Sequence, residues 1–354
     1  MGTPFASSPP TVIADFWTAT VGGDFWWVLI LKGGLVVLFL ATAFAYLTLA
    51  ERKVSARIQL RYGPNRVGPF GLLQPAADGI KLFFKENTAP AGRDRVLYQL
   101  GPTLAAGSAL FAFAVIPLGV NSWFGYQFHW DITHINVGLL FILGVTSLGV
   151  YSLFLGGFGA NSKYSLLGGL RSSAQLISYE MAVSFALIGV VILAGALDLE
   201  QIVGAQQHLW FIVLQPLAFV LYFSAAFAET NRAPFDLPEA ETELVAGYHT
   251  EYSAMRFGLY FLGEYVNMVI VCSIATTLFI GGWLPLLPWH PFDWIPGPFW
   301  FLGKVSILLF IMMWVRWTFP RLRYDRLMNF GWKVLLPLGL VNILVTGAVV
   351  AVRA

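Results

Sequence analysis

Eight stretches of the chain are almost wholly apolar and long enough to cross a lipid bilayer. A helix of about 20 residues spans the hydrocarbon core of a bilayer, and polar connections separate one such stretch from the next. We expect membrane-spanning helices at about 25–50, 101–120, 136–158, 171–197, 210–229, 257–284, 299–317 and 333–352. The pattern predicts an all-α integral membrane protein, with residues 25–354 forming a single membrane domain.

Composition agrees with this fold class. The 354 residues are 57% hydrophobic and 11% charged, and the mean hydropathy is +0.70. A soluble domain is typically about a quarter charged, and we find neither a soluble domain nor an internal repeat. The lipid bilayer is therefore the expected environment, and no nucleic-acid partner is expected.

Basic residues alternate between the connections. The first connection, 51–100, contains nine Lys and Arg residues, whereas the connections 121–135, 198–209 and 285–298 contain none. The remaining basic connections carry Lys163 and Arg171, then Arg232 and Arg256, then Arg321, Arg323, Arg326 and Lys333. Because positive loops are retained in the cytoplasm, this alternation predicts an even number of spans with both termini outside.

The first 24 residues contain no Lys or Arg, so they lack the basic region of a signal peptide and we expect an extracytoplasmic segment. Cys272 is the single cysteine, which rules out an internal disulfide or a cysteine-ligated cluster built by this chain alone. Of five histidines only His249 falls on the cytoplasmic side, and no two helices offer facing histidines for haem. We expect no metal, flavin or haem in this chain.

The first cytoplasmic connection has an amphipathic pattern. Lys53, Arg57 and Arg61 share one helical stripe, and glycine–proline breaks follow at 63–64 and 68–69. Beyond the breaks, one helical face carries Leu73, Ala77, Ile80 and Phe84, and another carries Asp78, Lys81 and Lys85. This pattern is typical of a helix lying in the membrane interface. A lipid-contacting loop, a docking surface for a soluble partner and the rim of a membrane-accessible cavity all fit it.

Three carboxylates fall within or at the end of apolar spans. Glu180 lies about nine residues past Arg171, roughly 14 Å along a helix, and Glu264 lies about two turns into the sixth span. Glu229 ends the fifth span. A carboxylate buried in a membrane must be neutralised, paired or hydrated, so such residues are functional candidates. The alternative is a structural role in which each carboxylate only hydrogen-bonds a neighbouring helix.

The connection after the fifth span concentrates negative charge. Six carboxylates occur between Glu229 and Glu251, with Arg232 as the only Lys or Arg among them. Asp236 and Glu239 have the spacing of a helix-capping box, which explains part of the cluster. Glu239 and Glu243 are four residues apart and repel each other on a helix. The cluster therefore shares protons, binds a cation or faces basic groups, for which the first connection is the obvious candidate.

Four long motifs resemble one known family. They are ERKVSARIQLRYGPNRVGPFGLLQPAADGIKLFFKE at 51–86, NSKYSLLGGLRSSAQLISYE at 161–180, ETNRAPFDLPEAETELVAGYHTEYS at 229–253 with GEY at 263–265, and RWTFPRLRYDRLMNFGWKVLLP at 316–337. Together they resemble the family of the H subunit (NADH dehydrogenase subunit one) of NADH:quinone oxidoreductase, respiratory complex I. The resemblance covers roughly residues 25 to 340 and all four cytoplasmic connections in order.

The resemblance implies an eight-helix membrane subunit that is not catalytic alone. Ubiquinone or menaquinone would be its bound substrate, and it would form the membrane-facing part of the quinone cavity. Its partners would be the peripheral-arm subunits with the quinone site and iron–sulfur clusters, and the adjacent membrane-arm subunits. The implied location is a bacterial cytoplasmic membrane, or the mitochondrial inner membrane in a eukaryote.

The resemblance also implies roles for individual residues. Quinone-cavity lining or bracing is implied for Arg52, Arg57, Arg61, Asp78, Lys81, Arg171, Arg232 and Arg316. An acidic chain from the cavity into the membrane is implied for Glu180, Glu229, Asp236, Glu239, Glu241, Glu243, Glu251 and Glu264. Related subunits of energy-converting hydrogenases and formate hydrogenlyases, which lack quinone chemistry, are one alternative. A self-contained ion transporter that uses the same acids is another.

Overall fold

The computed structural model describes residues 26–123, 126–129, 135–236, 245–285 and 295–353. Its first half contains α2 (Trp26–Ile58), a 3-10 turn (Pro69–Gly71), α3 (Gln74–Phe84), α4 (Arg95–Phe113), β1 (Val120–Trp123), β2 (Tyr126–His129), α5 (Gly138–Gly159) and α6 (Lys163–Ala194). Its second half contains α7 (Leu199–Gly204), α8 (Phe211–Leu214), α9 (Pro216–Glu229), a 3-10 turn (Gly247–His249), α11 (Ala254–Phe279), α12 (Gly297–Thr318), α13 (Tyr324–Phe330), a π-helical turn (Gly331–Leu335) and α14 (Leu336–Arg353).

Seven helical segments within the described ranges are long and apolar enough to cross a membrane: α2, α4, α5, α6, α11, α12 and the continuous stretch Tyr324–Val352. Each coincides with a span predicted from the apolar pattern. Helices satisfy their backbone hydrogen bonds internally, which is what a lipid environment requires. The described residues also include a departure from an all-α fold, because β1 and β2 form a short antiparallel hairpin in the connection between α4 and α5.

The predicted span 210–229 is not one continuous helix. It consists of the four-residue α8 and the 14-residue α9, which meet at Gln215. Gln215 has φ −132° and ψ 60°, outside the helical region. Pro216 follows it and has no backbone N–H to donate, and proline also disfavours helical geometry in the residue before it. The break therefore has a local cause in the sequence, although the apolar content of the stretch does not reveal it.

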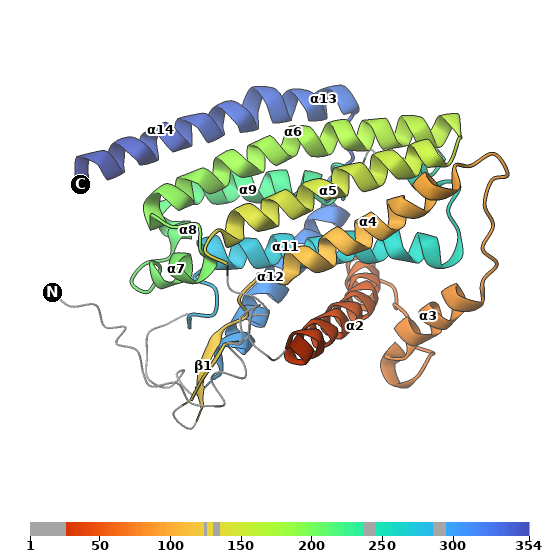
Figure 1. The fold of residues 1–354 in the computed structure, drawn as a ribbon, viewed down its shortest axis with the longest axis horizontal. Helices are drawn as coiled ribbons and strands as arrows, with labels where there is room; N and C mark the ends of the chain where they lie inside the picture. The colour runs from red at the N-terminus through yellow and green to blue at the C-terminus, as the bar shows by residue number, and fades with distance from the viewer. Residues whose placement is uncertain (1–25, 124–125, 130–134, 237–244, 286–294, 354) are drawn as a thin grey trace.

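The long helices lie side by side, and α6 occupies a central position (Figure 1). It packs against α5, α9 and α14, and α11 packs against α4 on another side of the same bundle. Most of α11 is buried from Val266 to Phe279. The predicted cytoplasmic connections gather at the end of the bundle near α3, whereas α7, α8 and the hairpin lie toward the opposite end.

Glycines allow the close contact between α4, α5 and α11. A methyl group added at Gly156 would lie 1.9 Å from the Tyr260 hydroxyl, and one added at Gly101 would lie 2.9 Å from the Gly156 Cα atom. We therefore expect Gly156→Ala to destabilise the domain by about 1–3 kcal/mol through overpacking, measured as a lower thermal unfolding midpoint. Gly149→Ala on the same helix is the control, since no heavy atom lies within 4 Å of its added methyl group. Equal midpoints for the two variants would contradict the prediction.

The first cytoplasmic connection begins inside a helix. α2 continues past the predicted boundary at residue 50 and ends at Ile58. Leu60, just after this end, adopts a left-handed φ of 55°. The Arg61 N–H donates to the Ala56 carbonyl over 2.8 Å, as in a Schellman C-cap. Lys53 and Arg57 therefore share a helix but Arg61 does not, so the expected three-residue stripe is shorter than predicted. The predicted interfacial helix forms as α3, with Ile80, Phe83 and Phe84 exposed.

Candidate functional site

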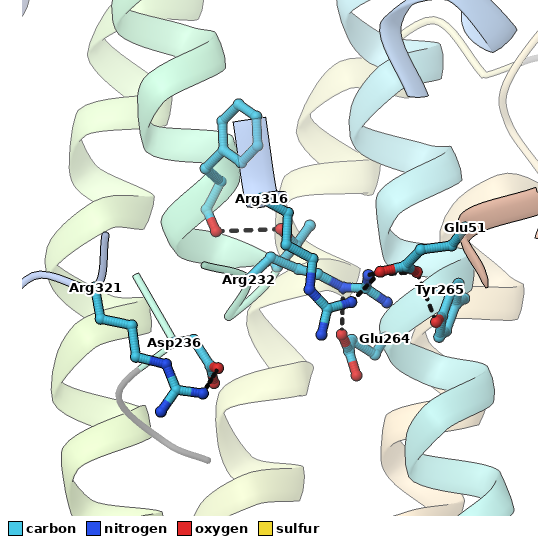
Figure 2. Close-up of polar contacts among 9 residues, drawn as sticks. Glu51, Arg232, Asp236, Glu264, Tyr265, Arg316 and Arg321 are labelled. Carbon is cyan, nitrogen blue, oxygen red and sulfur yellow. Dashed lines mark hydrogen bonds and ion pairs between the residues drawn. The ribbon is translucent and has the colours of Figure 1, made fainter. Parts of the chain in front are cut away.

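A buried arginine at the end of α9 joins three helices. Arg232 lies three residues beyond α9 and is 5% exposed. Its Nη1 donates to both oxygens of Glu51 on α2, over 2.8 and 2.7 Å, and its Nε donates to Glu264 Oε1 on α11 over 2.5 Å. Figure 2 shows the guanidinium between the two carboxylates. Burial alone would lower the pKa of Arg232, but Glu264 and Glu51 outweigh burial and raise it, so the side chain remains a cation.

Glu51 has two further partners. Tyr265 donates its hydroxyl proton to Glu51 Oε2 over 2.7 Å, and Arg316 on α12 donates to Glu51 Oε1. The Arg232 guanidinium also lies 4.3 Å from the centre of the Tyr265 ring, a cation–π distance. We call Glu51, Arg232, Glu264, Tyr265 and Arg316 the Arg232 cluster. Two carboxylates and two guanidinium groups balance in charge, so the cluster is tolerated in an apolar interior.

The chain immediately after Arg232 is held from two sides. The Gln175 side-chain amide on α6 donates to the carbonyls of Ala228 and Phe235, each over 2.9 Å. The Leu322 N–H, between α12 and α13, donates to the Pro234 carbonyl over 3.0 Å. Residues 232–236 therefore form a turn fixed against α6 and the connection between α12 and α13. Movement of this turn would alter the Arg232 cluster directly.

Asp236 ends the same turn and forms a second ion pair. Arg321 Nη2 lies 2.8 Å from Asp236 Oδ2, and the Asp236 side chain is 8% exposed. Burial raises the pKa of Asp236 to about 6, although Arg321 and Arg316 act to lower it. The sequence suggested the first connection as the basic partner of the acidic residues. For Asp236 the partner is instead Arg321 in the connection between α12 and α13, and Figure 2 shows this pair apart from the Arg232 cluster.

This carboxyl predicts a pH-dependent contribution to stability. Because its pKa is higher in the folded protein than the ordinary 3.8, folding favours the protonated form. Its contribution is fully present below about pH 4 and is lost as the pH rises through about 6. We expect the thermal midpoint of the natural protein, relative to Asp236→Asn, to fall between about pH 4 and pH 6 and to change little at higher pH. Asp325→Asn, at an exposed ion pair with Arg323, is the control; a pH-independent difference for Asp236→Asn would contradict the assignment.

Glu180 and Glu229 lie close to each other near the centre of the bundle. Glu180 is 17 residues past the first residue of α6, a 32-residue helix, and accepts a hydrogen bond from the Ser147 hydroxyl on α5. Glu229 is the last residue of α9, and the two carboxylates are near enough to repel each other electrostatically. Both side chains are partly buried. The pair extends the polar region from the turn at 232–236 toward α5.

The basic residues of the first connection mostly bind within that connection. Arg52 Nη1 lies 2.8 Å from Asp78 Oδ2, and Lys81 Nζ lies 3.5 Å from Asp78 Oδ1. The Arg52–Asp78 pair attaches α3 to α2, whereas Lys81 and Asp78 both lie in α3. Arg57 and Arg61 are exposed, with Arg57 6.0 Å from the Tyr62 ring and Arg61 bonded to the Gln59 side chain. None of these four cations is within the Arg232 cluster.

The other predicted site residues have different locations. Arg171 is partly buried in the third turn of α6. Glu251 offers its backbone carbonyl to the Tyr98 hydroxyl over 2.6 Å, so its best-defined contact is not made by its carboxylate. Glu239, Glu241 and Glu243 lie outside the described residues, as does any helix begun by the predicted capping box at Asp236 and Glu239.

His249 is an aromatic packing residue. Its ring lies 5.0 Å from that of Tyr248, 5.5 Å from Phe257 and 6.4 Å from Phe261. Burial lowers the pKa of this imidazole to about 4, so it is neutral at pH 7. Across the part of the chain that the structure describes, no group of three or more His, Cys, Asp or Glu is placed to hold a metal ion.

Glu51 is the functional candidate that sequence reasoning missed. It follows a long apolar run and precedes Arg52 and Lys53, so it resembles one charge in a basic loop. The structure places it inside α2, 5% exposed at its side chain, with two arginines and a tyrosine bound to it. One signal was available in the sequence. Glu51 directly follows the uncharged residues 33–50, so a membrane-spanning helix that continued past residue 50 would include this carboxylate.

Comparison with known proteins gives a consistent result. A family model described as NADH dehydrogenase matches residues 31–347. A Geobacter metallireducens protein named as an H subunit of NADH-quinone oxidoreductase is 53% identical over 323 residues, which is 91% of this chain and 96% of that protein. The chain belongs to the NADH dehydrogenase family.

Other members of the family are similarly close. The H subunit of NADH-quinone oxidoreductase from Rhodospirillum rubrum is 49% identical over 337 residues, covering 94% of this chain and 96% of that protein. The protein of the same name from Protochlamydia amoebophila is 52% identical over 311 residues, covering 86% and 92%. The family match includes every residue of the Arg232 cluster together with Asp236 and Arg321. The cluster is thus part of the family domain.

Proposed function

We propose that the chain is the membrane-embedded H subunit of a proton-translocating NADH:quinone oxidoreductase. The observation that carries this proposal is identity of about one half, over about nine-tenths of the chain, to proteins bearing that name. The chain would act as part of an oxidoreductase complex and not as an enzyme alone. Its quinone, ubiquinone or menaquinone, would be a substrate held jointly with partner subunits.

The proposed arrangement in the membrane has eight spans with both termini outside. Residues 25–354 would form one membrane domain, with the broken α8–α9 segment as the fifth span, and residues 1–24 would be extracytoplasmic. Seven apolar helices of spanning length and the alternation of basic connections support this arrangement. The bacterial relatives favour a bacterial cytoplasmic membrane.

The cytoplasmic end of the chain would form the membrane-facing part of the quinone cavity and its docking surface. Arg52 and Asp78 connect α2 to α3, and Lys81 pairs with Asp78 within α3. The exposed Phe83 and Phe84 of α3 would contact an isoprenoid tail or a peripheral-arm subunit. The other residues proposed to line or brace this region are Arg57, Arg61, Arg171, Arg232 and Arg316. The Arg232 cluster would brace the cavity from inside, because it ties α2, α11 and α12 together.

The carboxylates would couple quinone reduction to proton transfer. A quinone that accepts two electrons also takes up two protons, so charge and proton affinity change near the cytoplasmic ends of these helices. Glu264 and Glu229 would begin the proton path, and Glu180 would transmit charge toward adjacent membrane-arm subunits. Asp236, Glu239, Glu241, Glu243 and Glu251 would supply the acidic reservoir. The turn at 232–236 supports this proposal because it contacts Glu264, α6 and the last connection.

Affinity purification of the tagged full-length chain tests the assignment. We expect it to co-purify with subunits that oxidise NADH and carry iron–sulfur clusters, and the particle to reduce a quinone with NADH. An unrelated tagged multi-pass protein from the same membranes is the control. A particle that evolves hydrogen without quinone reduction would reassign the chain to a hydrogenase-type complex. Ion flux by the chain reconstituted alone would identify a self-contained transporter.

A further inference from the structure

Three polar side chains meet at the break between α8 and α9. Gln215 at the break is 5% exposed, and Asn342 and Thr346 of α14 are 8% and 7% exposed. They lie against Gly189 of α6, which is itself buried. Figure 1 shows α14 along one side of α6 and α9 along another. None of these three residues is in the Arg232 cluster or among the residues assigned a role above.

The hydrogen bond to the Gly189 carbonyl fixes the orientation of the Gln215 amide. Gln215 Nε2 donates to this carbonyl over 3.1 Å and also to the Thr346 hydroxyl over 2.9 Å. A carbonyl accepts and cannot donate, so the opposite orientation would place two acceptors together. Among the described residues, Gln215 Oε1 then has no hydrogen-bond donor and Asn342 Nδ2 has no acceptor.

The two unpaired atoms lie near each other beside Gly189. A methyl group added at Gly189 would lie 2.7 Å from Asn342 Nδ2 and 2.9 Å from Gln215 Oε1. Both atoms therefore lie within 3 Å of one point next to the Gly189 Cα atom, close enough to each other for one small molecule to contact both. Leaving a buried donor and a buried acceptor unpaired is unfavourable. Irregular backbone at membrane depth, such as that at Gln215, is also tolerated only when buried in protein or hydrated.

We propose that one water molecule binds between the Asn342 and Gln215 amides beside Gly189. The water accepts a hydrogen bond from Asn342 Nδ2 and donates one to Gln215 Oε1. A water fits even if the Asn342 amide is reversed, because it can donate to an oxygen at that position as well as accept from a nitrogen. A polar site with at least two partners is what a buried water requires. The bound water stabilises the start of α9, the helix whose last residue is Glu229.

A density map of the membrane assembly that resolves ordered waters elsewhere in this chain tests the site directly. We expect a peak within hydrogen-bonding distance of both amides beside Gly189, and no such peak in a Gly189→Ala variant. A direct hydrogen bond between the Asn342 and Gln215 amides with no peak between them would overturn the proposal, as would an empty space.

Hydrogen exchange of Asn342→Leu gives a second test with opposite outcomes. If a water joins the two amides, removing Asn342 leaves Gln215 Oε1 unpaired. Exchange of the backbone amides at 211–219 should then become at least about fivefold faster. If Asn342 Nδ2 is simply unpaired, leucine removes a buried orphan and exchange slows or is unchanged, which would overturn the site. Gly347→Ala on the same helix is the control, because its added methyl group meets no atom within 4 Å.

Discussion

We expect Arg232→Leu to abolish most of the assembled complex and its quinone reductase activity. The substitution removes the cation that Glu264 binds and one of the two arginines bound to Glu51. Removing one partner from a buried ion pair typically costs about 3–5 kcal/mol, because the remaining charge stays buried. That is a large share of the roughly 5–15 kcal/mol by which most domains are stable. The amount of chain in membrane complexes, measured by native gel and immunoblot, gives the first readout.

Arg232→Lys separates charge from geometry at this position. A lysine retains a positive charge but cannot bind Glu51 through one nitrogen and Glu264 through another in a planar arrangement. We expect the amount of assembled complex in Arg232→Lys to lie between that of the natural protein and that of Arg232→Leu. Arg323→Leu is the control for loss of an arginine, because its side chain is 79% exposed and its surface pair with Asp325 contributes little. Natural levels of complex and activity in Arg232→Leu would remove the cluster from any essential role.

The positions of seven of the eight expected spans were predictable, but their ends were not. The length of an apolar run measures only the part of a helix that lies in lipid. Where a helix continues beyond the lipid, the predicted end therefore falls short of the real one. For this reason α2 extends to Ile58 and α6 begins at Lys163, beyond the predicted boundaries at 50 and 171. The break at Gln215 was missed because apolar content was judged over the whole stretch, whereas the Gln215–Pro216 pair acts locally.

The candidate site was predictable as a set of charges but not as a set of pairs. Glu264 was singled out from its position, and roles for Arg232 and Arg316 were implied by the family resemblance, yet Glu51, which binds both arginines, was missed. Glu51 is 181 positions from Arg232 and 265 from Arg316 in the chain. Such pairings depend on how helices pack, which a single sequence does not specify. Asp236 shows the same difficulty, since its partner Arg321 lies 85 positions away in a different connection from the one expected.

Glu180→Gln should sharply reduce proton translocation while the complex still assembles. Glutamine has nearly the shape of glutamate and can still accept the hydrogen bond from Ser147, so the contact between α5 and α6 is retained. It cannot bind or release a proton at physiological pH. If Glu180 transfers protons, we expect translocation to fall by at least about tenfold, since positioned proton-transfer groups typically contribute a hundredfold or more. Quinone reduction and proton uptake are measured together in membrane vesicles.

The comparison of Gln and Leu at this position distinguishes proton transfer from a structural role. A residue that only pins α5 to α6 would tolerate Glu180→Gln and fail as Glu180→Leu, because leucine cannot accept the Ser147 hydrogen bond. A proton-transfer residue would fail in both variants. Glu200→Gln, the same exchange in the short helix α7, controls for loss of a carboxylate. Wild-type reduction and translocation by Glu180→Gln at normal assembly would exclude Glu180 from the proton path, and the acidic chain would then have to reach neighbouring subunits through other groups.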